Sequence, residues 1–313
     1  MGLVIRPSHS VSEIDADVDV DPERLRRAKK AYSTRFLADC LALLPNGYEL
    51  WDVEPSAGDF ILARTTEIGH HPKLESPGSR RQSMFVGDEI LVAFGNRYAP
   101  DQFLAVVPED LDPCSLVAGG GLAAKVVEQH ADIVQATSIE PIGLLAKDCA
   151  VVNLPDFAPH RVSAVTELPG RPQVIAVPGT SMNSDKSTTL GSLVNGLNGA
   201  GLTVSAGKAT GTGSGNDPWL FTHAGTQHVL DFTDFGFPTT FLTDHSKVRG
   251  LPTSLIGALT TAETDVVVVE TADRIAADCQ GGARADRCAG HQYVRSVHAG
   301  DGTEAAAGEH VGR

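Results

Sequence analysis

Apolar residues near the N-terminus recur every three or four positions, which is the spacing of one face of an α-helix. Asp21 can cap such a helix, Pro22 suits its first turn, and Asn46-Gly47 can close it. The apolar stripe consists of Leu25, Ala28, Tyr32, Phe36, Cys40, Leu41 and Leu44. The pattern predicts one long helix. The basic residues between positions 24 and 30 are either its solvated face or a nucleic-acid patch.

From Tyr48 to about Asp110 the pattern changes to short apolar runs separated by Gly, Pro and charged turns, which is typical of strands. The runs are residues 60–64, 83–86 and 89–94. Their spacing predicts a small antiparallel sheet or barrel rather than β-α-β units. A glycine run at 119–121 then leads into residues rich in Ala and Val, which we expect to be helical through about Val134.

Two polar pairs lie in the turns of this region. His70-His71 could bind a metal. No Cys or carboxylate stands nearby at ligand spacing, however, so the pair could equally belong to an exposed loop. Arg97-Tyr98 could face a substrate or could form a surface connection.

The second half alternates apolar runs with helical spacing, which is the order of a parallel α/β sheet. Strands are expected at residues 174–177, 202–206, 229–231 and 265–270. Between the first two, a helix is predicted that stops at Gly199 and Gly201. Its apolar positions are Leu190, Leu193, Val194 and Leu197.

The segment between the first of these strands and its helix is a small-residue loop that ends in Lys186-Ser187-Thr188. Unpaired N–H groups and the helix dipole favour an anion at a helix N-terminus. We expect Lys186 to contact the terminal phosphates of a bound polyphosphate, and Ser187 or Thr188 to offer a hydroxyl to Mg²⁺. The candidate cofactor-binding residues are Gly179, Thr180, Asn183, Ser184, Asp185, Lys186, Ser187 and Thr188.

Two positions depart from the phosphate-loop pattern G-x-x-x-x-G-K-[ST]. Thr180 stands at the first glycine position, with Gly179 one residue earlier, and Asp185 stands at the second. A carboxylate about 4 Å from a phosphate would cost roughly one to three decades of affinity, unless it turns outward or shares the magnesium. Three interpretations remain: a working phosphate loop, a P-loop fold with impaired binding, or coincidence.

Residues 173–270 resemble dethiobiotin synthetase-like enzymes, a family of ATP-dependent P-loop proteins. The resemblance rests on the early Gly179-Thr180, the Lys-Ser ending, and Lys208, Thr210, Gly211 and Asp217 after the second strand. It implies that Lys208 helps to hold an anionic substrate and that Asp217 helps to bind magnesium. It also implies that Glu270, at the end of the strand at 265–270, meets the metal. In the family a glycine-rich turn follows that glutamate, whereas Thr271-Ala-Asp follows it here.

These patterns predict an α/β protein: a P-loop NTPase-like parallel-sheet domain preceded by a small α+β, β-rich domain. The expected order is a flexible lead (1–20), a helix with a small β-rich domain (21–158), a linker (159–172), the P-loop domain (173–270) and an irregular tail (271–313). The tail lacks helical or strand periodicity, so we expect the nucleotide domain to be incomplete or to be completed by another subunit. In the second case the protein would be a homo-oligomer.

Composition restricts the partners of the chain. Its 313 residues carry a formal net charge of −14, which argues against nucleic acid or an anionic membrane as partner. The five cysteines are scattered and show no paired metal spacing, so they are expected to be reduced, cytoplasmic thiols. No apolar run approaches the length of a membrane span.

The function these features predict is a magnesium-dependent, ATP-using enzyme that activates a small carboxylate or amine, as a ligase or by phosphoryl transfer. Lys186, Lys208 and Glu270 would be catalytic, and Ser187, Asp217 and Glu270 would hold the metal. Two alternatives stay open. The loop could bind coenzyme A in an acyltransferase, or the chain could be a nonenzymatic nucleotide sensor or a degenerate NTPase.

Overall fold

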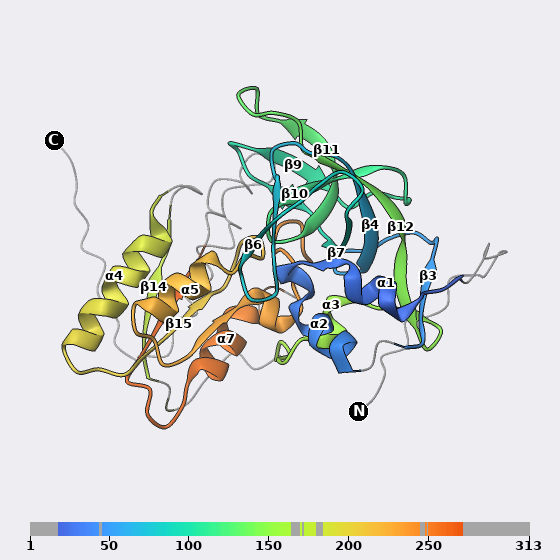
Figure 1. The fold of residues 1–313 in the computed structure, drawn as a ribbon. Helices are drawn as coiled ribbons and strands as arrows, with labels where there is room; N and C mark the ends of the chain where they lie inside the picture. The colour runs from blue at the N-terminus through green and yellow to red at the C-terminus, as the bar shows by residue number, and fades with distance from the viewer. Residues whose placement is uncertain are drawn as a thin grey trace.

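The structure is a computed structural model that describes residues 18–43, 46–163, 170, 172–179, 184–244, 248 and 250–271. The chain forms a β-rich part followed by an α/β part, and the two lie side by side (Figure 1). The predicted fold class is therefore confirmed. The expected tail at 271–313 lies outside the described residues except for Thr271.

The β-rich part is built on a mixed sheet of eleven strands. Its strands are β1 (Val18–Asp19), β2 (Lys29–Lys30), β3 (Tyr48–Trp51), β4 (Phe60–Glu67), β7 (Glu89–Phe94), β8 (Arg97–Tyr98), β9 (Phe103–Val106), β10 (Cys114–Ala118), β11 (Leu122–Gln129), β12 (Thr137–Lys147) and β13 (Ala150–Val151). A hairpin of β5 (Lys73–Glu75) and β6 (Arg81–Ser83) stands apart from this sheet. The helices are α1 (Pro22–Arg27), η1 (Tyr32–Thr34), α2 (Arg35–Leu43) and α3 (Leu154–Phe157).

The sequence predicts a small antiparallel sheet or barrel; the observed sheet is larger and mixed in direction, and it closes on itself as the barrel alternative does. Strands β12, β4, β7, β11 and β10 pair in a closed ring, and β7 pairs in parallel with both β11 and β2. Five of the six residues of β7 are buried. A strand that is covered on both faces is uniformly apolar and does not alternate, and this explains the run Ile90 to Phe94.

The single helix predicted after Asp21 is wrong as well, although Asp21 does cap α1 by accepting a hydrogen bond from the Glu23 N–H at 3.0 Å. The ammonium of Lys30 donates to three main-chain carbonyls around the end of α1. Lys29 and Lys30 themselves form β2, which pairs with β7. Tertiary pairing therefore overrides the helical spacing. The last residues of the expected flexible lead, Val18–Asp19, pair with β3.

The helix expected after Gly121 is instead β11, which pairs with β7, β9 and β10. Ala123 and Ala124 are fully buried in the sheet. Alanine is a good helix former, but its small side chain also fits where layers approach closely. The close approach of layers also explains Gly121, at φ +95°, because a Cβ there would overlap the side chain of Ala31.

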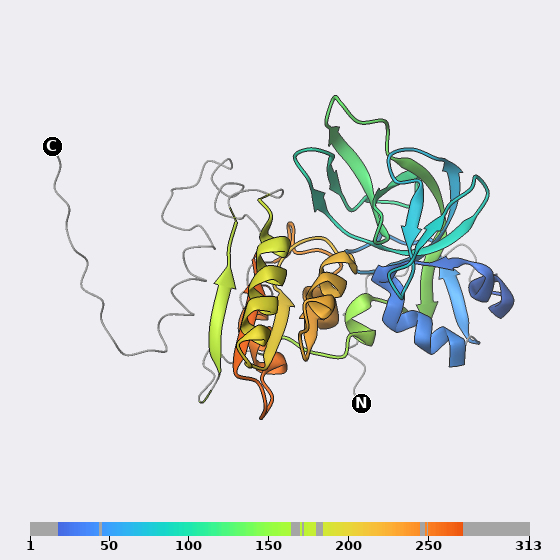
Figure 2. The same cartoon turned by 60° about the vertical axis from the view of Figure 1, so that its left-hand side comes forward.

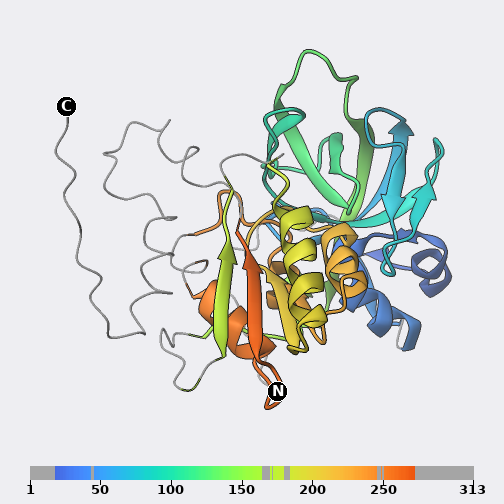
Figure 3. The same cartoon turned by 90° about the vertical axis from the view of Figure 1, so that its left-hand side faces the viewer.

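The α/β part has a parallel sheet in the order β14-β17-β15-β16, covered by helices on both faces (Figure 3). Its elements are β14 (Gln173–Val177), α4 (Lys186–Gly199), β15 (Val204–Lys208), α5 (Asn216–His223), β16 (Val229–Asp231), η2 (Phe232–Phe235), α7 (Leu251–Leu259) and β17 (Val266–Glu270). Val266 and Val268 pack towards α4 and α5, whereas Val267 and Val269 pack towards α7. The four consecutive valines thus serve two cores. Within the described residues, no helix combines the length and apolar character needed to cross a bilayer.

The two parts meet at the β16 side of the parallel sheet, opposite β14 (Figure 2). Arg35 of α2 lies 3.0 Å from Asp234 and 3.7 Å from Asp231. The Tyr32 hydroxyl donates to Asp231 at 3.0 Å. Asp231 also accepts from the Thr233 N–H, and its own N–H donates to Asp234. Asp231 and Asp234 thus cap the turn of η2 and bind the β-rich part through Arg35.

This interface predicts a pH-dependent stability. Burial, and then the charge of Asp231, raise the pKa of Asp234 to about 6. Arg35 lowers this pKa, but its single guanidinium is shared between the two carboxylates and does not offset the rise. A carboxyl whose pKa is raised on folding contributes stability below its ordinary pKa and loses it as pH rises through the folded value. From about pH 4 to 7 this carboxyl should therefore remove up to about 3 kcal/mol.

Thermal melts of the parent and of Asp234→Asn across that range test the effect. The parent should lose more stability than the variant as pH rises. Parallel pH profiles for the two proteins would contradict it.

Candidate functional site

The predicted phosphate loop does separate a strand from a helix. β14 ends at Val177 and α4 begins at Lys186. The Lys186 side chain lies back over the loop, since a Cβ at Gly179 would overlap Lys186 and Ser184. Lys186 is only 6% exposed, and its ammonium donates to the Ser184 hydroxyl at 3.4 Å. Glycine is thus required at position 179, because the lysine side chain crosses it.

Asp185 occupies the left-handed region of the backbone, at φ 51° and ψ 29°, immediately before α4. Glycine adopts this conformation without strain, whereas Asp tolerates it better than most other residues. The second glycine of the general pattern therefore has a backbone reason. Asp185 is exposed and its side chain makes no capping hydrogen bond, so the carboxylate faces solvent.

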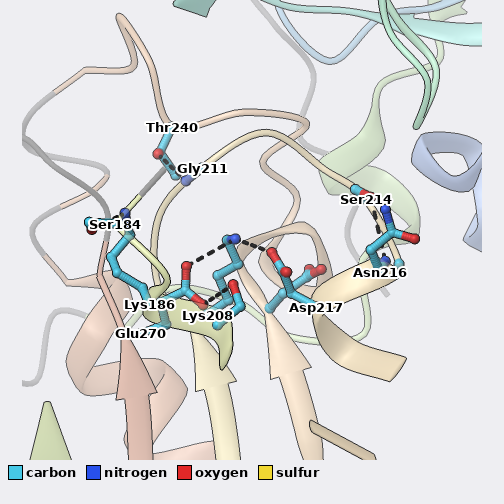
Figure 4. Close-up of polar contacts among 12 residues, drawn as sticks. Ser184, Lys186, Lys208, Gly211, Ser214, Asn216, Asp217, Thr240 and Glu270 are labelled. Atoms are coloured by element: carbon cyan, nitrogen blue, oxygen red, sulfur yellow. Dashed lines mark hydrogen bonds and ion pairs between the residues drawn. The ribbon is translucent and has the colours of Figure 1, made fainter. Parts of the chain in front are cut away.

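Four predicted site residues come together beside the carboxyl ends of β15 and β17. Figure 4 labels three of them, Lys208, Asp217 and Glu270. The Ser187 hydroxyl donates to Glu270 at 2.8 Å. The ammonium of Lys208 lies 3.1 Å from Glu270 and also pairs with Asp217. Glu270 is 1% exposed. The cluster thus joins the first turn of α4, the ends of β17 and β15, and the first turn of α5.

Charge balance holds this cluster together. Burial would lower the pKa of Lys208, but the carboxylates of Asp217 and Glu270 more than offset burial and raise it above its ordinary value. Lys208 therefore stays an ammonium ion between two acids. Ser187, Glu270 and Asp217 are hard oxygen donors of the kind that Mg²⁺ prefers. A metal there would have to compete with this ammonium for both carboxylates.

The glycine-rich loop after Lys208 is held between the two parts of the chain. Glu75 of β5 accepts hydrogen bonds from the Ser214 hydroxyl and the Gly215 N–H, both at 3.0 Å. A Cβ at Gly120 would overlap the carbonyl oxygen of Gly213. The β-rich part thus fixes the N-terminus of α5, from which Asp217 reaches Lys208. Sequence reasoning missed Glu75, because nothing local marks a contact about 140 positions away.

Of the remaining predicted cofactor-binding residues, one lies in the described part of the chain and two do not. Thr188 is exposed on the first turn of α4, whereas Thr180 and Asn183 lie outside the described residues. Gly211 donates its N–H to the Thr240 hydroxyl at 2.9 Å (Figure 4). Thr240 carried no recognisable signal in the sequence.

The histidine pair of the β-rich part is not part of this cluster. His71 is half-buried and its Nε2 lies 3.0 Å from the Val117 carbonyl oxygen. Among the described residues, no group of three or more His, Cys, Asp or Glu side chains is placed to hold a metal ion.

Comparison with known proteins places the chain in no family. No family model matches it, and no curated protein does. Among solved structures it is similar to the signal recognition particle receptor FtsY from Elizabethkingia anophelis in complex with GDP, with 21% identity, a TM-score of 0.27, and coverage of 41% of this chain and 37% of that one. It is also similar to the signal recognition particle 54 kDa protein from Aeropyrum pernix K1 in complex with GDP, with 16% identity, a TM-score of 0.24, and coverage of 47% and 30%. The chain spans about a third of the length of these structures. The dethiobiotin synthetase-like resemblance stays a prediction.

Proposed function

We propose that the chain is a magnesium-dependent P-loop enzyme that uses ATP to activate a small carboxylate or amine. The observation that carries the proposal is the Ser187–Glu270 hydrogen bond, formed beside Lys186 at the point where a glycine-started loop enters α4. A hydroxyl and a carboxylate in direct contact at this place are suited to share one hard cation. Ligase and phosphoryl-transfer chemistry both fit such a site.

Each residue has a separate role in this proposal. Lys186 and the main-chain N–H groups at the start of α4 would bind the phosphates. Ser187 and Glu270 would hold Mg²⁺, which neutralises phosphate charge when it is bound. Lys208 would face the anionic substrate, and Asp217 would either join the metal or hold Lys208 in place. Rate enhancement would come mainly from positioning and electrostatic stabilisation.

One observation favours a second candidate, an acyltransferase that uses the same loop for coenzyme A. Lys208 already neutralises Asp217 and Glu270. A site whose carboxylates are paired with an ammonium needs no metal, and the phosphates of coenzyme A can be bound by N–H groups and lysine alone. The two candidates therefore differ in their dependence on magnesium.

Calorimetric titrations of ATP, with and without Mg²⁺, and of acetyl-coenzyme A separate these functions. Magnesium-dependent ATP binding supports the first candidate, and metal-independent binding of acetyl-coenzyme A supports the second. If neither ligand binds to the parent or to Asp185→Gly, the phosphate-loop assignment is wrong.

Asp185→Gly should bind ATP-Mg up to about tenfold more tightly than the parent. The change removes a carboxylate beside the phosphates, and since Asp185 is exposed, screening by water keeps the gain at the low end of the expected range. Asp185→Asn is the matched control, because it removes the charge but keeps a side chain that tolerates the left-handed backbone. The two variants should gain similarly. Binding seen only in the variants would indicate a degenerate site, as in the degenerate-NTPase alternative.

A further inference from the structure

Arg97, on β8, is a buried cation that has no ion pair among the described residues. The residue is 8% exposed. Its Nη2 donates to Gln102 Oε1 at 2.7 Å. Its buried Nε has no hydrogen-bond partner in the part of the chain that the structure describes. The other buried guanidinium discussed above, that of Arg35, has two carboxylates within 4 Å.

This arrangement is costly for the folded protein. A buried charge is ordinarily paired, because its desolvation is expensive. Burial lowers the pKa of Arg97 to about 10, although the charge of Asp101 opposes the effect. An arginine whose pKa is about 10 is still charged near neutral pH, so deprotonation does not remove the cost of burying the charge. Groups with strongly perturbed pKa values cluster at functional sites.

The surroundings of Arg97 favour one kind of anion. Burial, and then the charge of Arg97, lower the pKa of His71 to about 4, so this imidazole is neutral near pH 7. The rings of His70, His71 and Phe103 lie edge to face, with centroids 4.8 to 6.0 Å apart. The site thus offers one positive charge, an amide and aromatic surface. A single carboxylate on a short carbon chain matches it better than a doubly charged phosphate does.

We propose that Arg97, His71 and Gln102 form a binding site for a small organic acid, whose carboxylate pairs with the Arg97 guanidinium. The site does not depend on the proposed nucleotide function. Successive side chains of a strand face opposite sides. Tyr98, next to Arg97, stacks on Phe241 of the α/β part with ring centroids 5.6 Å apart, so Arg97 faces into the β-rich part.

Thermal melts of the whole chain with increasing propionate or benzoate, at constant ionic strength, test this site, with chloride and inorganic phosphate as comparison anions. We expect a saturable rise in melting temperature with the carboxylates only. In Arg97→Met the protein without ligand should melt at the same temperature or higher, because an unpaired buried charge is replaced by an apolar side chain of similar length. The carboxylate-dependent rise should disappear.

Two further variants keep the result decisive. Arg97→Lys keeps the charge but loses the paired donors of the guanidinium, and should bind carboxylate roughly 10- to 100-fold more weakly. Arg64→Met changes an exposed arginine of the same sheet and should leave the carboxylate effect intact. The proposal is overturned if no carboxylate gives a saturable shift to the parent, if phosphate stabilises it more than the carboxylates, or if Arg97→Met keeps the full effect.

Discussion

Lys208→Met is expected to destabilise the protein by about 3–5 kcal/mol, which is the cost of breaking a buried ion pair by removing one partner. The ammonium is the partner of both Asp217 and Glu270, whose side chains are 25% and 2% exposed. Methionine fills the space of the lysine stem but leaves two carboxylates close together without a cation. The midpoint of urea unfolding, compared between variant and parent, measures the effect.

Two controls show whether charge is responsible. Lys125 is exposed on β11, so Lys125→Met should change stability by less than about 0.5 kcal/mol. Adding Glu270→Gln to Lys208→Met removes one of the two uncompensated carboxylates and should recover part of the loss. If Lys208→Met is as stable as the parent, or if the second substitution worsens it, the ion cluster does not hold this edge of the sheet together.

The α/β part could be predicted largely because its signals are local. Four β-branched residues in a row predict a strand buried on both faces, and β17 packs its valines into two cores. Strand, loop and Lys-Ser at a helix start follow one another within a few residues. Parallel strands then bring Ser187, Lys208 and Glu270 to one edge without further information.

The β-rich part could not be predicted in the same way, because distant contacts decide it. Leu25 and Tyr32 do share a helical spacing, but pairing of Lys29–Lys30 with β7 breaks the helix between them. Ala123 and Ala124 favour a helix locally and are fully buried in a sheet. In both places the partner strand comes from another region of the chain, so no local window contains the deciding interaction.

The site shows the same division. Lys208 and Asp217 are singled out by the resemblance, but their mutual ion pair could not be predicted from it. The contact of Glu75 with Ser214 and Gly215 crosses between the two parts. The ion cluster at the carboxyl ends of the parallel strands therefore depends on how the two parts of the chain pack together, which a local motif does not encode.

Lys186→Met is expected to weaken ATP binding by roughly 10- to 100-fold, the equivalent of one lost charge-assisted hydrogen bond or more. Its ammonium lies at the start of α4, with the side chain folded over Gly179, where the helix dipole and the loop also favour an anion. Methionine keeps the length and the apolar packing of a residue that is 6% exposed, so the fold should survive. Calorimetry with ATP, in the presence and absence of Mg²⁺, measures the loss.

Ser187→Ala separates phosphate binding from metal binding at the same helix end. Removing its hydroxyl deletes the hydrogen bond to Glu270 and a candidate metal donor, but no positive charge. ATP without metal should therefore bind to Ser187→Ala as it does to the parent, and only the gain from Mg²⁺ should shrink. Lys186→Met should lose affinity in both conditions, because its charge acts on the phosphates directly. If Lys186→Met binds ATP-Mg as tightly as the parent, the anion lies elsewhere and the arrangement around Gly179 is structural.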